Sequence, residues 1–331
     1  MPSLSVVIPS RDTRELTLAC LDSLPPAIDG APLEVIVVDD AGSDDTAEAV
    51  AARHPEAEVL RAPQPLGFTR AANLGLSRAA GEIVLLLNSD TEVDAAALPA
   101  LLAAFAADSR LGAAGAALRY PDGRPQWSGG PAPTLPWLFA LASGLPRLLG
   151  RLPLYRRLRP PAGSPASRPL EVDWVTGAAL SVRRAALRDT GVFDERFRFY
   201  GQDLDLCLRL RAAGWRVAVI PGFRILHHHG ATIGSVVGSE GSGGAGAGGQ
   251  HPELLWTDLL AWAAKHKSAR WTARARRALL AGARLRLLGR RIASPFLPAS
   301  RRELWRRQTA IFQRAVAAIQ AVALPPSLPQ G

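Results

Sequence analysis

The fold of this chain is decided by a short apolar run that ends in two acids, Leu33-Glu-Val-Ile-Val-Val-Asp-Asp40. A nearly continuous run of β-branched residues is typical of a strand that is buried on both faces of a parallel sheet. A second run, Ile83-Val-Leu-Leu-Leu87, has the same character and ends in Asn88-Ser-Asp90. Polar residues therefore follow two buried strands directly, which is where ligands bind in open α/β sheets.

Strands and helices are expected to alternate along the first third of the chain. The predicted strands are residues 4–8, 33–38, 59–61 and 83–87, and the predicted helices are 13–24, 46–53, 67–80 and 95–107. Strands separated by helices of this length predict parallel βαβ units. The sequence therefore indicates an α/β fold with a mostly parallel central sheet.

Composition predicts three parts. Residues 1–235 form the expected α/β domain, in which residues 121–169, rich in Pro, Gly and Arg, predict an irregular insertion. Residues 236–250 are rich in Gly and Ser, which is typical of a linker or a mobile loop. Residues 251–331 form a basic C-terminal region, with long helices expected at 253–291 and 301–323 around Ser294-Pro-Phe-Leu-Pro298.

The net charge of +10 is concentrated in this C-terminal region. Residues 251–331 hold 15 of the 39 Lys and Arg residues but only 3 of the 29 acids. Basic helices that also carry Trp256, Trp262, Trp271 and Trp305 suit an anionic membrane surface. The other interpretation, which stays open, is that the region packs its apolar face on the α/β domain and leaves its arginines solvated.

The chain is expected to be cytoplasmic, with peripheral attachment to the inner face of the cell membrane if the basic region docks there. A strand begins at Leu4, and no basic region or cleavage site precedes it. The most apolar stretch, around residues 135–149, is interrupted by prolines and an arginine and is too short to span a bilayer. Cys20 and Cys207 give no disulfide framework, which agrees with a reducing compartment.

Asp39 and Asp40 leave a predicted strand side by side. They can be solvated acids, with Ser43 or Asp44 capping the next helix. However, carboxylates at the ligand-binding edge of a sheet also accept hydrogen bonds from a nucleotide base or ribose. In the loop that follows the next strand, the Gly67 backbone and Arg70 can face a pyrophosphate, although Arg70 is equally well placed to be a surface residue.

Asn88-Ser-Asp90 is a candidate metal site. One or two carboxylates can hold a Mg²⁺ or Mn²⁺ ion. If the ligand is a nucleotide, such an ion neutralises the negative charge that develops on a diphosphate when it leaves. Asp90 can supply such a carboxylate. The alternative is an Asx turn that leads into the helix after Asp94.

A third polar cluster combines the turn Val172-Asp-Trp-Val-Thr-Gly177 with the start of an amphipathic helix at Gln202-Asp-Leu-Asp205. On a helix, side chains two residues apart point about 200° away from each other, so Asp203 and Asp205 cannot both face one substrate. One of them is expected at the site. Asp205 can instead pair with Arg209 at i,i+4.

Three histidines follow the last predicted strand, His227-His-His229. Alternate side chains of a strand point to opposite faces, so His227 and His229 share one face and His228 takes the other. The three therefore cannot all bind one metal ion from a strand.

Together these motifs resemble inverting glycosyltransferase family 2. They are strand-Pro, Asp-Asp, Asn-X-Asp, Trp-X-X-Gly with X-Asp-X-Asp, and His-X-X-Gly-X-Thr, in that order between residues 4 and 232. The Asp173-Trp-Val-Thr-Gly177 and Gly191-Val-Phe-Asp-Glu195 elements are similar to those of rhamnosyltransferase-type members. The resemblance implies the GT-A (nucleotide-diphospho-sugar transferase) fold and a Mg²⁺ or Mn²⁺ cofactor. It also implies hexosyl or deoxyhexosyl transfer from a nucleotide-diphosphate sugar to a glycan or lipid-linked acceptor, in cell-surface polysaccharide or glycolipid assembly.

The resemblance also implies a role for individual residues. Asp203 is the catalytic base, and Asp90 and His227 bind the metal, with His229 as a possible substitute for His227. The nucleotide-sugar residues are Pro9, Ser10, Asp40, Asn73 and Ser89, although Asn73 can equally brace neighbouring loops. Trp174, Gly177 and Gln202 lie on the acceptor side.

The chain departs from the family pattern at Gln202, where the usual residue is Glu. This change supports the alternative function, a catalytically degenerate protein that still binds sugar nucleotides. A nucleic-acid partner is not expected, because no recognition motif accompanies the arginines and residues 1–250 are slightly acidic. Neither a dinucleotide-binding fingerprint nor a Walker motif occurs in the sequence.

Overall fold

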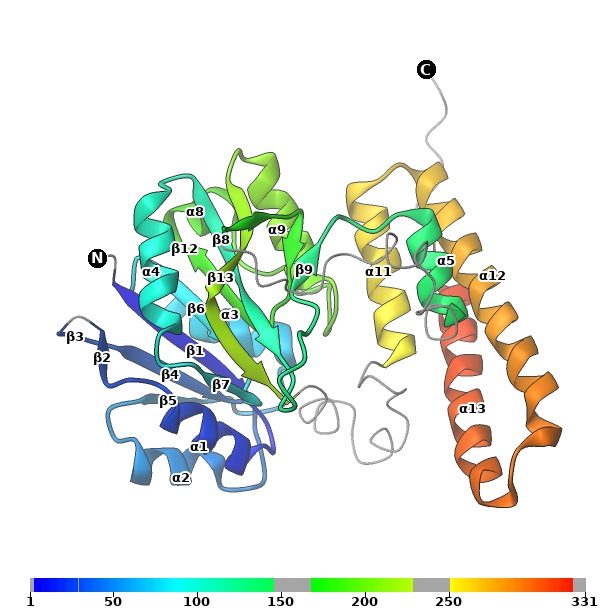
Figure 1. Cartoon of the computed structure of the whole chain (residues 1–331), viewed down its shortest axis with the longest axis horizontal. Helices are drawn as coiled ribbons and strands as arrows, with labels where there is room; N and C mark the ends of the chain where they lie inside the picture. The colour runs from blue at the N-terminus through cyan, green and yellow to red at the C-terminus, as the bar shows by residue number, and fades with distance from the viewer. Residues whose placement is uncertain (1–2, 29, 146–167, 229–250, 324–331) are drawn as a thin grey trace. The chain divides into compact units, whose positions relative to one another are not determined.

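The computed structural model describes residues 3–28, 30–145, 168–228 and 251–323. These residues form two compact units (Figure 1). The first unit holds residues 3–132, 168–198 and 202–228, and the second holds 133–145, 199–201 and 251–323. The linker predicted at residues 236–250, residues 146–167 of the predicted insertion and His229 lie outside the described residues.

Within the described residues, a nine-stranded sheet forms the centre of the first unit. Its strands are β1 (Leu4–Ser10), β4 (Glu34–Asp39), β5 (Glu58–Arg61), β6 (Ile83–Leu87), β7 (Thr91–Val93), β8 (Leu111–Arg119), β10 (Leu170–Glu171), β12 (Ala179–Arg183) and β13 (Arg216–His227). The order is β10-β13-β8-β12-β6-β1-β4-β5, and β7 pairs with β13. The sheet is parallel, as predicted, in its first four strands along the chain, which are β1, β4, β5 and β6. β12 runs antiparallel to both of its neighbours, β6 and β8.

Helices cover both faces of the sheet. Those of the first unit are α1 (Arg14–Asp22), α2 (Thr46–Arg53), α3 (Phe68–Arg78), α4 (Ala97–Ala107), α8 (Arg184–Thr190) and α9 (Gln202–Ala212). Two short antiparallel pairs, β2 (Ala27–Ile28) with β3 (Ala31–Pro32) and β9 (Gly129–Gly130) with β11 (Trp174–Val175), lie outside the main sheet. Each strand and helix predicted before residue 107 is found within about two residues of its expected bounds, as the variation in helix ends allows.

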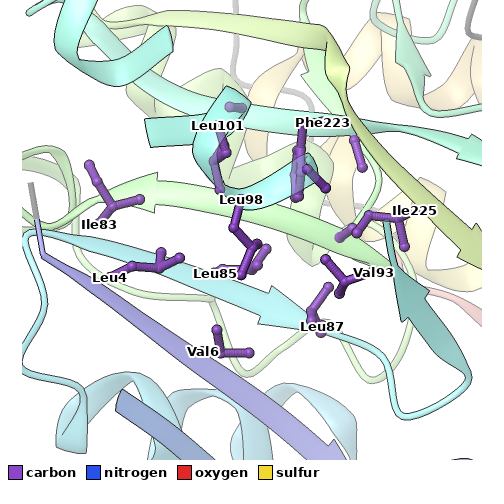
Figure 2. Packing of buried hydrophobic residues seen from close by; sticks show 14 of the residues in the cluster. Leu4, Val6, Ile83, Leu85, Leu87, Val93, Leu98, Leu101, Phe223 and Ile225 are labelled. Carbon is purple, nitrogen blue, oxygen red and sulfur yellow. The ribbon is translucent and has the colours of Figure 1, made fainter. Parts of the chain in front are cut away.

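Alternate residues of β1 show how the sheet is buried on both faces. Val6 packs in a cluster with Leu85 of β6 and Leu98 of α4, on one face (Figure 2). Val7 points to the other face, where it meets Gly75 of α3. Because neighbouring side chains of a strand point in opposite directions, α3 and α4 lie on opposite faces of the sheet.

The register of the strands places the polar loops next to one another. Ser10 at the end of β1 pairs with Asp39 at the end of β4. At the other side of β1, β6 ends at Leu87, which pairs with Ala179 of β12. β1 runs two residues beyond its predicted end, because Pro9 and Ser10 still pair with β4.

The second unit is helical. Its elements are α5 (Leu135–Ser143), α11 (Pro252–His266), α12 (Ala269–Ala293), the 3₁₀ helix η2 (Ser294–Phe296) and α13 (Ala299–Ala321). The prediction of one helix over 253–291 is wrong, because the chain breaks after His266 and Ser268 begins a new helix. The Ser268 hydroxyl accepts a hydrogen bond from the Trp271 backbone N–H at 3.2 Å, which caps α12.

A short loop segment, residues 199–201, belongs to the second unit through α11. The buried Asp258 carboxylate accepts hydrogen bonds from the backbone N–H groups of Phe199 (3.3 Å) and Tyr200 (2.9 Å). The Tyr200 hydroxyl accepts a further one from the His251 backbone N–H at 3.0 Å. The chain therefore enters the second unit for three residues directly before α9 begins.

In the part of the chain that the structure describes, none of the helices combines the length and the apolar character needed to cross a membrane.

Gly75 offers a test of the packing of α3 on the sheet. A Cβ atom at this position would collide with Val7 of β1 and come within 3.1 Å of Val38 of β4. Although Ala is favoured over Gly in a helix by about 1 kcal/mol, Gly75→Ala should lower the free energy of unfolding by about 1–3 kcal/mol because of overpacking.

Gly289 of α12 is the matched control, because a Cβ atom there meets nothing within 4 Å. Gly289→Ala should therefore leave the melting temperature unchanged or raise it. Thermal unfolding of both variants decides the matter, and a raised melting temperature for Gly75→Ala would contradict the packing of α3.

Candidate active site

The Asp39–Asp40 loop is tied to the start of α3. The Asp40 carboxylate accepts hydrogen bonds from the backbone N–H groups of Leu66 (2.5 Å) and Gly67 (3.0 Å), one on each oxygen. Asp39 accepts one from the Gly42 N–H at 2.9 Å, and burial raises the pKa of its carboxyl group. Both acids are thus buried and bonded to backbone rather than solvated, and each Asp40 oxygen keeps a lone pair for a further donor.

Ser10 and Ser89 belong to a buried chain of hydroxyl groups. Thr13 contacts the Ser10 hydroxyl at 3.0 Å and the Ser89 hydroxyl at 2.9 Å, and Ser10 also contacts Thr17 at 2.8 Å. Pro9 is buried within β1. Through Thr13, Ser10 and Ser89 therefore join the ends of β1 and β6 to the start of α1. The family pattern assigns both serines, with Pro9, to the nucleotide pocket.

Asp12 was not predicted as a site residue from the sequence. It has a φ of 51°, and its Oδ1 accepts hydrogen bonds from the backbone N–H (2.6 Å) and hydroxyl (3.1 Å) of Ser43. In return, Asp44 accepts one from the Arg14 N–H at 2.8 Å. The loops after β1 and β4 are thus cross-linked. A signal existed in the sequence, since Asp12 stands in the loop after a predicted strand and Asp tolerates the left-handed conformation better than most residues.

Asp90 and His227 lie together at the end of the sheet. β7 pairs with the end of β13, with Thr91 opposite His227. The His227 Nε2 atom is 3.3 Å from an Asp90 carboxylate oxygen, and both side chains are buried. The two residues that the family pattern assigns to the metal are 137 positions apart in the chain and adjacent in the structure.

Gln126 orients the His227 ring. Its side-chain oxygen lies 2.7 Å from His227 Nδ1, and its amide nitrogen donates to the His227 backbone carbonyl at 3.0 Å. A proton on Nδ1 that is donated to Gln126 leaves the lone pair of Nε2 directed at Asp90. Holding a ligand histidine through its other ring nitrogen is usual at metal sites. Gln126 lies in the predicted insertion, where no pattern marked it.

The donor set fits one divalent cation. Among the described residues, no group of three or more His, Cys, Asp or Glu side chains is placed to hold a metal ion. A carboxylate and an imidazole would be the protein ligands of such an ion at Asp90 and His227. Mg²⁺ is commonly held in this way, by one or two side chains together with substrate phosphates and water.

Asp203 lies at the start of α9 and is held by two backbone groups. Its Oδ2 accepts a hydrogen bond from the Gly177 N–H at 2.9 Å, and its Oδ1 accepts one from the Leu204 N–H at 2.8 Å. Burial raises the pKa of the Asp203 carboxyl group, and these hydrogen bonds oppose the rise. The side chain keeps part of its surface accessible.

Gln202 and the tryptophan turn adjoin Asp203. Gln202 is 4% exposed, and its side-chain oxygen has no hydrogen-bond partner among the described residues. Trp174 packs edge-on against Trp127, with ring centroids 4.7 Å apart, and donates to the Pro131 carbonyl at 3.2 Å. This side of the site thus combines a carboxylate, an unpaired buried carbonyl oxygen and aromatic rings.

The loop of Asp90 and the turn of Gly177 are neighbours. The Asn88 N–H donates to the Ala178 carbonyl at 3.0 Å, directly beyond the pairing of β6 with β12. Ala178 follows Gly177, whose N–H holds Asp203. A short series of backbone contacts therefore connects the candidate metal site to the candidate base.

Asn73 and Arg70 make protein contacts. The Asn73 amide donates to the Phe193 carbonyl (2.9 Å) and accepts from the Phe193 N–H (3.1 Å), so it pairs with this loop as a second backbone would. Arg70 forms a 3.0 Å ion pair with Glu195 at the surface. Of the alternatives that the sequence left open, these contacts favour the brace for Asn73 and the surface residue for Arg70.

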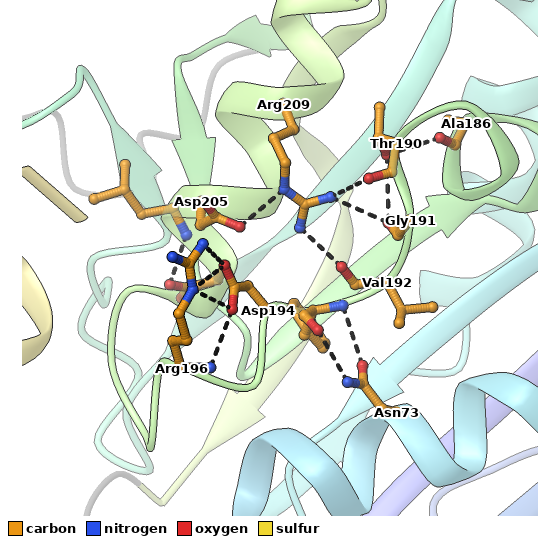
Figure 3. Close-up of polar contacts among 12 residues, drawn as sticks. Asn73, Ala186, Thr190, Gly191, Val192, Asp194, Arg196, Asp205 and Arg209 are labelled. Atoms are coloured by element: carbon orange, nitrogen blue, oxygen red, sulfur yellow. Dashed lines mark hydrogen bonds and ion pairs between the residues drawn. The ribbon is translucent and has the colours of Figure 1, made fainter. Parts of the chain in front are cut away.

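The predicted pair of Asp205 with Arg209 is confirmed, at 2.9 Å (Figure 3). Asp205 is 0% exposed. The Arg209 guanidinium also donates to the backbone carbonyls of Thr190 (2.5 Å), Gly191 (3.3 Å) and Val192 (2.8 Å). Arg209 thus connects α9 to the loop that follows α8, and Asn73 of α3 binds the same loop at Phe193.

Comparison with known proteins identifies the family of this chain. Residues 5–159 match the model of glycosyl transferase family 2, and residues 163–325 match that of glycosyl transferase family group 2. The N-acetylglucosaminyl-diphospho-decaprenol L-rhamnosyltransferase of Mycobacterium tuberculosis is 32% identical over 212 residues, which cover 60% of this chain and 67% of that protein.

Solved structures share the fold at lower identity. The mannosyltransferase PcManGT from Pyrobaculum calidifontis, in complex with GDP-Man and Mn²⁺, has a TM-score of 0.58 at 17% identity, over 97% of this chain and 87% of that chain. S. aureus TarS 1-349 in complex with UDP-GlcNAc has a TM-score of 0.51 at 17% identity, over 95% and 81%.

Removal of Arg209 should destabilise the protein strongly. Arg209→Met removes the cation that pairs with the buried Asp205 carboxylate, and we expect the free energy of unfolding to fall by about 3–5 kcal/mol. Arg211→Met is the control, because Arg211 forms partly exposed ion pairs with Glu171 and Asp173 whose loss should cost less than about 1 kcal/mol.

Urea denaturation measures both effects. A second variant, Asp205→Leu with Arg209→Met, removes both charges and should be more stable than Arg209→Met alone. Equal losses for Arg209→Met and Arg211→Met would contradict the role of the buried pair.

Proposed function

Because this chain belongs to glycosyltransferase family 2 and has the GT-A fold, we propose that it moves a sugar from a nucleotide-diphosphate donor to a hydroxyl acceptor, with inversion and with a divalent metal ion. The observation that carries the proposal is the contact between Asn88 and Ala178, which sets the Asp90–His227 pair beside the turn that holds Asp203.

Asp90 and His227 would hold the metal ion. When bound, a Mg²⁺ or Mn²⁺ ion neutralises the charge that develops on the departing diphosphate. Gln126 keeps the His227 ring in place, and the β7–β13 pairing keeps Asp90 opposite it. The structures of PcManGT with GDP-Man and of TarS with UDP-GlcNAc support a nucleotide-sugar donor.

Asp203 acts as the general base. Its carboxylate takes the proton of the acceptor hydroxyl as the acceptor oxygen forms a bond to the anomeric carbon. The bond from that carbon to the diphosphate oxygen breaks on the opposite side, which inverts the configuration. Among the described residues, one backbone N–H group from Gly177 or Leu204 donates to each Asp203 oxygen, which leaves a lone pair for the hydroxyl proton.

Gln202 is expected to position the acceptor. Its unpaired side-chain oxygen is buried beside Asp203 and can accept a hydrogen bond from a second acceptor hydroxyl. A Gln retains this capacity where the family usually has a Glu. The substitution therefore does not by itself argue for the degenerate binding protein.

The similar mycobacterial enzyme suggests the substrate class. Its name describes L-rhamnosyl transfer to an acceptor that is linked to decaprenol through a diphosphate. We extend this to hexosyl or deoxyhexosyl transfer onto a glycan or lipid-linked acceptor, in cell-surface polysaccharide or glycolipid assembly. The proposal includes a cytoplasmic location and peripheral association of the basic C-terminal region with an anionic membrane.

Nucleotide binding should depend on the metal ion through Asp90. GDP, UDP and dTDP should each be tested by titration calorimetry, with Mn²⁺ and with EDTA, to find the nucleotide that binds. Asp90→Ala should abolish the increase in affinity that Mn²⁺ gives. Asp94→Ala is the control, since Asp94 is exposed and four residues away. Equal affinities with and without Mn²⁺ in the wild-type protein would contradict the metal site.

Asp203→Asn should separate binding from chemistry. Removal of a general base lowers kcat by a factor of about 10² or more, whereas the Kd of the donor should stay within a few-fold. Asp22→Asn, at an exposed ion pair of α1, is the control. Transfer or donor hydrolysis is the assay, and a near wild-type rate for Asp203→Asn would transfer the role of base to another group.

The pH profile gives an independent readout for the same base. The base must be deprotonated, so activity falls as pH drops through the pKa of Asp203. Because burial raises this pKa, the acidic limb should lie above the value of about 4 that an ordinary Asp shows. A limb at or below that value would indicate that Asp203 is not the base.

A further inference from the structure

Exposed apolar side chains gather at one end of the second unit. Among the described residues, the large hydrophobic side chains classed as exposed are Leu74 (36%), Val192 (41%), Leu285 (41%), Leu288 (54%), Ile292 (62%), Phe296 (84%) and Leu304 (53%). Five of these seven lie between residues 285 and 304, where α12, η2 and α13 form a helical hairpin. We refer to these five residues as the tip patch.

The backbone under the tip patch is held firmly. The Arg290 guanidinium lies 3.7 Å from the centre of the Trp305 ring and donates to the Trp305 carbonyl at 2.7 Å. Trp305 donates in return to the Arg290 carbonyl at 3.1 Å, and Arg290 reaches the Thr309 hydroxyl at 2.8 Å. These contacts join α12 to α13 near η2, so the apolar side chains are presented on a fixed hairpin.

The helix lengths explain why the tip patch is uncovered. α12 has 25 residues and α13 has 23, whereas their partners α11 and α5 have only 15 and 9. α5 packs on α12 at Gly282, and α11 packs on α13 where Trp256 stacks on Phe312. The ends of α12 and α13 near η2 thus extend beyond the shorter helices (Figure 1).

Two of the four tryptophans do not form this surface. Trp256 and Trp262 are 1% and 0% exposed, since they fill the core of the second unit. The prediction that these two tryptophans are interfacial is wrong. Among the described residues of the second unit, the large hydrophobic side chains classed as exposed are those of the tip patch, which makes it the apolar surface available for a membrane contact.

The hairpin that carries the tip patch is also strongly cationic. Arg284, Arg291, Arg301, Arg302 and Arg306 are exposed on it. From residue 268 to the end of the sequence, Glu303 is the sole acid, and Arg307 pairs with it at 2.9 Å. Exposed apolar residues and cations on one hairpin match the two layers of an anionic bilayer surface, the acyl boundary and the phosphate headgroups.

We propose that the hairpin tip docks on an anionic lipid bilayer, with Leu288, Ile292 and Phe296 inserted among the acyl chains and the arginines on the headgroup phosphates. This rests on the membrane association included in the proposed function and names the surface responsible. It does not depend on sugar transfer, so it is tested with lipid alone.

The experiment is co-sedimentation of the full chain with vesicles that contain no acceptor. Binding is expected with phosphatidylglycerol mixed into phosphatidylcholine, and much less with phosphatidylcholine alone. Ile292→Ser with Phe296→Ser should weaken binding about tenfold or more, since each buried CH₂ group contributes to insertion. The control Leu74→Ser removes an exposed apolar residue of the first unit and should bind as the wild type does.

Charge is tested in the same way. Arg291→Gln and Arg301→Gln should each lower the affinity about fivefold at low salt, whereas Arg188→Gln, at an exposed position of α8, should have no effect. Unchanged melting temperatures show that the variants fold. Failure of vesicle binding with donor hydrolysis intact would overturn this inference and leave the transferase function standing.

Insertion of the tip into the bilayer is measured by the fluorescence of a dye attached at position 296. Burial raises the pKa of the Cys20 and Cys207 thiols to about 12, so a thiol introduced by Phe296→Cys is labelled selectively. A polarity-sensitive dye there should shift to the blue with anionic vesicles, and one placed by Arg188→Cys should not. A tip that is covered by a second copy of the chain, seen as a dimer that Phe296→Ser dissociates, would overturn the proposal.

Discussion

The antiparallel pairing of β12 with β6 holds the two halves of the candidate site together. β6 leads into the loop of Asp90, and β12 begins directly after the turn of Gly177. Side chains alternate along a strand, so a slip of one residue would turn every side chain of β12 to the other face. The same slip would carry the Gly177 N–H away from Asp203. The register of one strand pair therefore sets the distance between the groups proposed to act on the donor and those proposed to act on the acceptor.

The first half of the fold could be predicted because its central strands are largely apolar. Residues 35–38 and 83–87 are buried on both faces, and a short, wholly apolar run between polar loops is typical of a central strand. The second half gave weaker signals. β10 and β11 have two residues each, too few for a recognisable strand pattern. α11 and α12 are separated by two residues, and the helical pattern of apolar residues continues across this break. Local chemistry at Ser268, rather than the apolar pattern, decides where one helix ends and the next begins.

Candidate site residues could be predicted from the sequence where they stand in a motif. Residues that are singled out by their contacts in the folded chain could not. Asp90, His227 and Asp203 stand in recognisable sequence patterns, and the structure brings the first two together. Gln126 and Asp12 stand in none, because each matters only through the partner that the fold supplies. Conversely, Ser10 and Ser89 occupy motif positions, yet their hydroxyl groups meet Thr13 inside the protein. A motif records the type of a residue but not the internal partner that the fold gives it.

The second unit shows why charge and aromatic content alone do not locate a binding surface. A small helical unit buries a limited fraction of its surface, so its largest side chains are needed to fill the core. Trp262 packs edge-on against Trp271 at 5.7 Å, and Lys267 lies over the Trp262 ring, so part of the basic character is also used internally. Arg286 does the same over Phe312 at 4.4 Å. The surface that remains for a partner is set by the unequal helix lengths. Among the described residues of the second unit, they leave large apolar and cationic side chains exposed together where the two longest helices meet.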